Sequence, residues 1–118
     1  MSATPSDERR VVSTVKGMIV AVVRFPLDPP LSSAEAAAAF EASAPNYQNV
    51  PGLVRKHYLL GEGGRVGGGV YLWESQAAAE ALYDDAWRAR LEARYGHAPS
   101  VEFYESAVTV DPDRIEVT

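Results

Sequence analysis

The chain has 118 residues, a formal net charge of −5 and no cysteine. Without cysteine it has no disulfides, thiolate nucleophiles, iron–sulfur clusters or cysteine-bound structural zinc. An acidic chain lacks the basic surface that binds nucleic acids and anionic membranes, so we expect neither as a partner. The length and an apolar fraction of 47% predict one globular domain.

Residues 1–16 are predicted to form a polar, flexible leader. Lys16 and Gly17 interrupt the apolar pattern, Arg24 ends the next apolar run, and no small-residue cleavage site follows, which argues against a secretion signal. No run of about 18 apolar residues occurs, so no membrane-spanning helix is predicted. We therefore expect a cytoplasmic protein.

Strands and capped helices are predicted to alternate after the leader. A first strand at 18–25 precedes a helix that begins at Ser32, where Ser32 and Glu35 have the spacing of a capping box. Pro45 should kink this helix, or end it and start a last turn. Strands are expected at 53–60 and 66–73, joined by a glycine-rich hairpin loop at 61–64.

A second helical region follows in two segments, the first capped by Ser75 and the second beginning as a turn or helix at Asp84-Asp85 and ended by Gly96. The last strand is expected at 101–110. The order βαββαβ predicts an α+β, ferredoxin-like fold with an antiparallel sheet and helices on one face. We place this domain at 17–112 and a C-terminal tail at 113–118.

Two of these strands are apolar on both faces, at 18–23 and 70–73. A strand with one face in water alternates apolar and polar residues, whereas a strand buried on both faces does not. The helices can cover only one face of the sheet, so the other face needs a different cover. We expect a second copy of the chain to provide it in a homodimer.

Glycines at 67–69 open the third strand and do not form a phosphate-binding loop, because they lead into a strand and not into a helix. Two interpretations remain open. The glycines give room to bulky neighbours, or a ligand lies against the bare backbone there.

His57 is the candidate proton acceptor, since a histidine titrates near neutral pH. Strand alternation puts Arg55 and His57 on one face of the sheet and Lys56 and Tyr58 on the other. A hydrogen-bonded interface role for His57 remains the alternative.

The helices facing the sheet are rich in alanine, so the many aromatic side chains either fill a close-packed core or wall a pocket. No Ser–His–Asp arrangement and no pair of buried carboxylates stands out.

The chain resembles the dimeric α+β barrel superfamily at Pro51-Gly52-Leu53, at the run Gly68–Ser75 and its alanine-rich helix, and at Trp87 and Tyr95-Gly96. Within that superfamily it is most similar to YdhR-like proteins, near the antibiotic-biosynthesis monooxygenases. The resemblance implies a homodimer whose sheets pack face to face, with one pocket between the sheet and the helices of each subunit.

In cofactor-free, quinone-forming relatives, activated aromatic substrates react directly with dioxygen. Trp73 matches the tryptophan that ends the third strand of these relatives. Gly69 and Ala79 stand where they have an asparagine and a helix tyrosine. The haem-degrading branch needs a histidine on the second helix, and this helix has none.

The resemblance therefore predicts a cofactor-independent monooxygenase that acts on a small hydrophobic molecule, aromatic or polycyclic, without a metal or flavin of its own. The expected catalytic residues are His57, Trp73 and Tyr71, and the expected substrate-binding residues are Arg24, Tyr47, Arg55, Trp87 and Tyr104. Two alternatives are a non-catalytic small-molecule binding or sensing dimer, and an isomerase or cyclase on the same scaffold.

Overall fold

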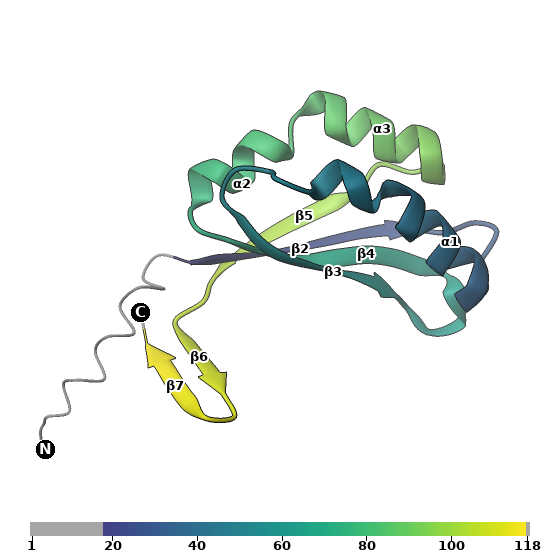
Figure 1. Ribbon diagram of the computed structural model, residues 1–118. Coiled ribbons are helices and arrows are strands. Elements are labelled where there is room, and N and C mark those ends of the chain that lie inside the picture. Colours follow the sequence, from purple (N-terminus) through teal and green to yellow (C-terminus); the bar gives the residue numbers. More distant parts are fainter. Residues whose placement is uncertain (1–17, 118) are drawn as a thin grey trace, which may run out of the picture.

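The computed structural model describes residues 18–117, so the predicted leader at 1–16 lies outside the described residues. Helices and strands follow one another in the predicted order (Figure 1). The elements are β2 (Ile19–Pro26), α1 (Ser33–Ser43), η2 (Ala44–Tyr47), β3 (Leu53–Leu60), η3 (Glu62–Gly64), β4 (Val66–Trp73), α2 (Gln76–Leu82), α3 (Asp85–Tyr95), β5 (Ser100–Glu105), β6 (Val108–Asp111) and β7 (Arg114–Val117).

Four strands form one antiparallel sheet in the order β3-β4-β2-β5, and the described helices lie on one of its faces (Figure 1). This is the predicted α+β, ferredoxin-like fold. Toward the helices β2 presents a row of buried apolar side chains, Ile19, Ala21, Val23 and Phe25. Its other face, with Val20 and Val22, is only half-buried, so the sheet has one covered face and one open face.

The ends of the helices form where the sequence predicts them. Ser32 and Glu35 close a capping box at the start of α1, and Asp84 caps α3 by accepting a hydrogen bond from the Trp87 backbone N–H. Gly96 ends α3 with a left-handed φ of 90°. Of the two outcomes predicted for Pro45, the structure shows the second: α1 ends at Ser43 and a short 3-10 turn follows.

The predicted last strand, 101–110, is divided in two. β5 pairs with β2 as far as Glu105, and after residues 106–107 the chain enters β6, which pairs only with β7. This two-stranded hairpin extends away from the helices, beyond the end of the sheet (Figure 1). Val108 and Val110 are exposed on it, at 55% and 68%. The alternation of residues predicted one continuous strand, because the residues of β6 have the same strand character as those of β5.

The glycines of β4 leave space that other side chains fill. A side chain at Gly67 would meet the ring of Phe25, and one at Gly69 would lie 3.2 Å from the Tyr71 ring and 3.4 Å from Cε of Lys56. The first interpretation of this run, room for bulky neighbours, therefore holds at both positions.

None of the described helices is long and apolar enough to cross a membrane.

The turn before β4 provides a matched test of local packing. Gly63 and Gly64 both have positive φ, 74° and 69°, but only at Gly64 would a Cβ collide with the Leu31 backbone carbonyl. At Gly63 the nearest atoms belong to the flexible Arg65 side chain, at 3.7 Å and beyond. Gly63→Ala should lower the free energy of unfolding by about 1 kcal/mol from backbone strain alone, and Gly64→Ala by clearly more. Urea unfolding measures both variants, and equal losses would contradict the close approach of Leu31.

Candidate functional site

A partly enclosed pocket of about 450 Å³ lies between the helices and the covered face of the sheet. Its walls are mainly aromatic and apolar, with a few polar and basic groups. The lining residues are Phe25, Ser43, Asn46, Tyr47, Lys56, Tyr58, Gly68, Tyr71, Leu82, Arg90, Leu91, Ala93, Arg94 and Tyr95. The volume falls within the range of small-molecule sites, which are about 300–1,000 Å³.

Lys56 is the polar centre of this pocket. It lies in the middle of β3, and its Nζ lies 3.4 Å from the ring centroid of Tyr47 and 3.6 Å from that of Tyr58. The Tyr71 ring on β4 is 4.7 Å away. Three rings from three different elements therefore surround one amine.

Burial lowers the pKa of Lys56 to about 7. Ring faces attract an ammonium group, but removal from water disfavours the charged form more strongly here. The only ion pair among the side chains of residues 18–113 joins Arg24 to Glu102, so no described carboxylate pairs with Lys56 to hold its proton. At neutral pH a large fraction of Lys56 is consequently a free amine, which can accept a proton.

The surrounding phenols stay protonated. Burial is the main cause that raises the pKa of Tyr58 and of Tyr71 above the ordinary value of tyrosine. Tyr58 also shares a 2.6 Å hydrogen bond with the hydroxyl of Ser43 at the end of α1. These tyrosines are therefore neutral hydrogen-bonding groups beside the amine.

Both tryptophans lie behind the pocket and do not line it. Trp87 is 0% exposed and donates from Nε1 to the Tyr47 hydroxyl at 3.1 Å. Trp73 is also 0% exposed and donates from Nε1 to the Tyr83 hydroxyl at 3.0 Å. Of the predicted catalytic and binding residues, Tyr47 and Tyr71 line the pocket. Trp87 holds the hydroxyl of the lining residue Tyr47, whereas Trp73 holds that of Tyr83, which does not line the pocket.

The other predicted site residues lie on the opposite, open face of the sheet. His57 stands opposite Val70 in the register and is exposed, and Arg55 lies on the same face opposite Leu72. Neither lines the pocket. His57 and Trp73 lie on opposite faces of the sheet, because adjacent residues of a strand point to opposite faces and Lys56 takes the covered one.

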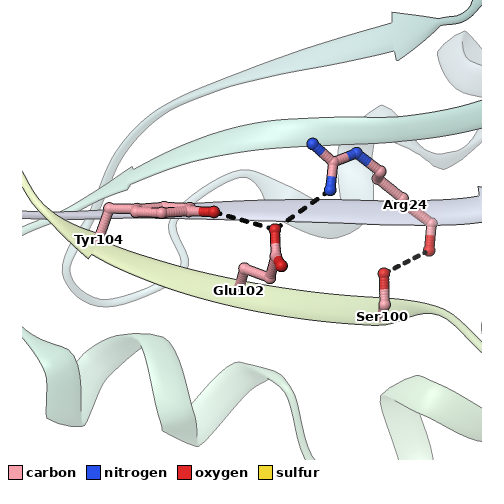
Figure 2. Close-up of polar contacts among 4 residues, drawn as sticks. All are labelled: Arg24, Ser100, Glu102 and Tyr104. Atoms are coloured by element: carbon pink, nitrogen blue, oxygen red, sulfur yellow. Dashed lines mark hydrogen bonds and ion pairs between the residues drawn. The ribbon is translucent and has the colours of Figure 1, made fainter.

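Arg24 and Tyr104 also belong to the open face, where they meet the carboxylate of Glu102, which was not among the predicted site residues (Figure 2). Glu102 Oε1 accepts from Arg24 Nη1 at 3.1 Å and from the Tyr104 hydroxyl at 3.0 Å. Both partners of the ion pair are more than half exposed. These residues form a surface cluster on β2 and β5 that is separated from the pocket by the sheet.

Sequence reasoning missed Lys56 and the basic and amide groups that line the pocket with it, Asn46, Arg90 and Arg94. One signal was present: alternation had already put Lys56 and Tyr58 on the same face. What was missing was which face meets the helices. Among the residues that the structure describes, no three His, Cys, Asp or Glu side chains gather as metal ligands.

A protein-family model described as "Putative mono-oxygenase ydhR" matches residues 20–108. This range covers the four-stranded sheet and the helices, and it confirms the family that the sequence motifs indicated. Among curated proteins, none matches the chain by sequence.

Solved structures share the fold at low identity. A monooxygenase from the gene ActVA-Orf6 of Streptomyces coelicolor, in complex with the ligand Nanaomycin D, superposes with a TM-score of 0.63 at 22% identity, over 86% of this chain and 97% of that one. SnoaB, a cofactor-independent oxygenase from Streptomyces nogalater, gives a TM-score of 0.58 at 18% identity, over 80% and 97%. Protein SO0527 from Shewanella oneidensis gives 0.58 at 21%, over 77% and 92%. At these identities the likeness establishes the fold.

The ionisation of Lys56 can be measured directly, because the chain has only two lysines, Lys16 and Lys56. With ¹³Cε-labelled lysine, NMR should show one resonance that titrates near pH 7 and disappears in Lys56→Met. The Lys16 resonance, assigned with Lys16→Arg, serves as the internal reference. Titration of the Lys56 resonance near the ordinary value of about 10.4 would contradict the buried amine.

Proposed function

The chain belongs to the ydhR mono-oxygenase family, and from this premise we propose that it oxidises an aromatic or polycyclic phenol with dioxygen and needs no cofactor of its own. The observation that carries the proposal is an amine, Lys56, whose pKa burial lowers to about 7 and which lies inside a pocket walled by tyrosine rings. SnoaB is named a cofactor-independent oxygenase, and the ActVA-Orf6 monooxygenase was solved with a bound Nanaomycin D, so related folds hold both the activity and a ligand of this kind.

Lys56 acts as the general base in this proposal, in place of His57. A neutral phenol reacts poorly with dioxygen, whereas its anion is electron-rich and gives up an electron more easily. Lys56 Nζ takes the phenolic proton and becomes ammonium, and the resulting pair of opposite charges lies in a site where burial strengthens its attraction. A base that titrates near the working pH is well matched to this step.

The phenolate then reacts with dioxygen, which is the oxidant and enters from solution. One electron passes to dioxygen, the aryloxyl radical and superoxide combine to form a carbon–oxygen bond, and the Lys56 ammonium protonates the resulting peroxide to a hydroperoxide. The Lys56 amine then takes the ring hydrogen as a proton while the O–O bond breaks and hydroxide leaves, which forms the quinone carbonyl, and the Lys56 ammonium passes that proton to the hydroxide to give water. The balance is one phenol and one dioxygen to one quinone and one water, and Lys56 ends as the amine.

The neutral side chains around Lys56 position the substrate. Tyr47 and Tyr58 offer ring faces for stacking and hydroxyls for hydrogen bonds, and the amide of Asn46 lines the same pocket. Trp87 donates to the Tyr47 hydroxyl and thereby fixes the direction in which that hydroxyl points. Since Tyr71 is a buried, protonated phenol, it can donate to a phenolate oxygen without losing its own proton.

The open face of the sheet supports the proposal of a homodimer. Its central strands carry a layer of half-buried apolar side chains, with Leu59 at 42% exposure and Tyr104 at 52% on the outer strands. Contiguous apolar surface of this kind indicates an interface. A second copy, packed face to face, would cover it and would place His57 and the Arg24–Glu102 pair at the subunit contact instead of in the catalytic pocket.

Replacing Lys56 tests the base. Lys56→Met should reduce oxygen uptake with an activated phenol such as an anthrone or a dihydroxynaphthalene by about 10²-fold or more, because it removes the proton acceptor. In the wild type, kcat/KM should rise with pH through about 7 as the ammonium becomes amine. His57→Ala, the neighbour on the other face of β3, is the matched control and should keep the wild-type rate.

The opposite ranking of these two variants, with His57→Ala inactive and Lys56→Met active, would show that the base is on the open face. Product formation from the same substrate without oxygen would point to an isomerase or cyclase.

Sedimentation equilibrium tests the dimer. Val70→Asp puts a charge at the centre of the open face, opposite Val22 in the register, and should produce monomers at micromolar concentration. Ala89→Asp, an exposed position on α3, adds the same charge elsewhere and should leave the dimer intact. A wild-type protein that sediments as a stable monomer would refute the assembly.

A further inference from the structure

We propose that the substrate of this pocket carries an acidic group, such as a carboxylate, and that Arg90 and Arg94 bind that group at the pocket mouth while the phenol reaches Lys56 inside. The inference rests on the proposed function for the identity of the inner group, and it adds the substrate's charge and its orientation.

The charge of the lining is the first observation. The chain as a whole carries a net charge of −5, yet the pocket is lined by Lys56, Arg90 and Arg94 and by no aspartate or glutamate. An acidic protein that concentrates basic groups in this pocket attracts a ligand of the opposite sign.

The placement of the two arginines is the second observation. Arg90 and Arg94 are four residues apart on α3, so they lie on the same side of that helix, and both are exposed at the edge of the pocket that they line. The guanidinium of Arg94 is close enough to the phenols of Tyr58 and Tyr95 to oppose the rise of their pKa values. The positive charge of α3 thus acts on the aromatic walls.

Among the side chains of residues 18–113, no carboxylate forms an ion pair with either guanidinium, because the ion pair there is Arg24–Glu102, on the other face of the sheet. Arg90 and Arg94 therefore retain their donors for a ligand. Guanidinium groups bind carboxylates through paired N–H donors, which makes them specific for a planar acid.

The difference in ionisation between the two arginines and Lys56 sets the orientation of the ligand in the pocket. A guanidinium group keeps its positive charge in proteins, whereas burial lowers the pKa of Lys56 to about 7, so that the amine loses its charge as the pH rises through neutrality. The permanent positive charge of the lining is therefore at the mouth. An acid that is already ionised in solution is held there, and a neutral phenol is carried inward to the amine.

Two fluorescent dyes that differ mainly in one charge test the proposal. 1-Anilinonaphthalene-8-sulfonate is an anionic aromatic, and N-phenyl-1-naphthylamine is its neutral counterpart. At pH 8, where Lys56 is mostly neutral, the wild type should bind the anionic dye at least about tenfold more tightly than the neutral dye.

In Arg90→Ala/Arg94→Ala this preference should disappear while binding of the neutral dye stays unchanged. Arg88→Ala, which removes one positive charge from α3 at a residue that does not line the pocket, is the control for a charge lost elsewhere on the helix and should retain the preference. Equal binding of both dyes by the wild type, or an equal loss of anion binding in Arg88→Ala, would overturn the proposal.

The same variants separate this inference from the proposed reaction. With a hydroxynaphthoic acid as substrate, Arg90→Ala/Arg94→Ala should raise KM at least about tenfold and leave kcat near the wild-type value, whereas Lys56→Met should lose kcat and still bind the anionic dye. Selective dye binding without oxygen uptake on any phenol would refute the oxidation and keep the anion site. Oxygen uptake with no preference for acidic phenols would refute the anion site and keep the oxidation.

Discussion

Side chains on neighbouring residues of a strand point to opposite faces of the sheet, and in this protein helices cover only one of those faces. Together these two facts put the basic side chains of β3 on different faces of the sheet. Lys56 and Tyr58 enter the pocket beneath the helices, and His57 and Arg55 enter the open face. A shift of β3 by one residue would exchange the two sets, so the register of β3 against β4 decides which basic group meets a substrate.

The buried Lys56 amine is stabilised by the aromatic rings around it, and hydrogen bonds fix the hydroxyls of those rings. Burying Lys56 costs free energy, since the charged form loses its water. Ring faces of Tyr47 and Tyr58 recover part of that cost for the ammonium and offer an apolar contact to the amine. The hydroxyls of those rings are fixed in turn by Trp87 and by Ser43. The buried Trp87 therefore serves the site indirectly, as a support for the pocket residue Tyr47.

Most of the fold could be predicted from the sequence because its signals are local. Ser32, Asp84 and Gly96 mark helix ends through their own hydrogen bonds and backbone angles, and the apolar pattern of β2 marks a central strand. The site was harder to predict. Alternation separates Lys56 from His57, but β2 and β4 are apolar on both faces, so nothing local shows which face the helices cover. The lowered pKa of Lys56 and the hydrogen bonds of the tryptophans arise only from packing between distant segments. The division of the last strand also depends on tertiary context, because β2 begins at Ile19, opposite Glu105, and offers β5 no strand partner beyond that pair.

A structure of the protein with a bound hydroxylated aromatic acid tests the account most directly, because it locates the ligand, its orientation and the open face in one experiment. The account predicts the rings of the ligand among Tyr47, Tyr58 and Tyr71, its phenol oxygen within hydrogen-bonding distance of Lys56 Nζ, its acid beside Arg90 and Arg94, and a second subunit over the face that carries His57. A ligand seated against His57 on the open face, with the pocket beneath the helices empty, would contradict it.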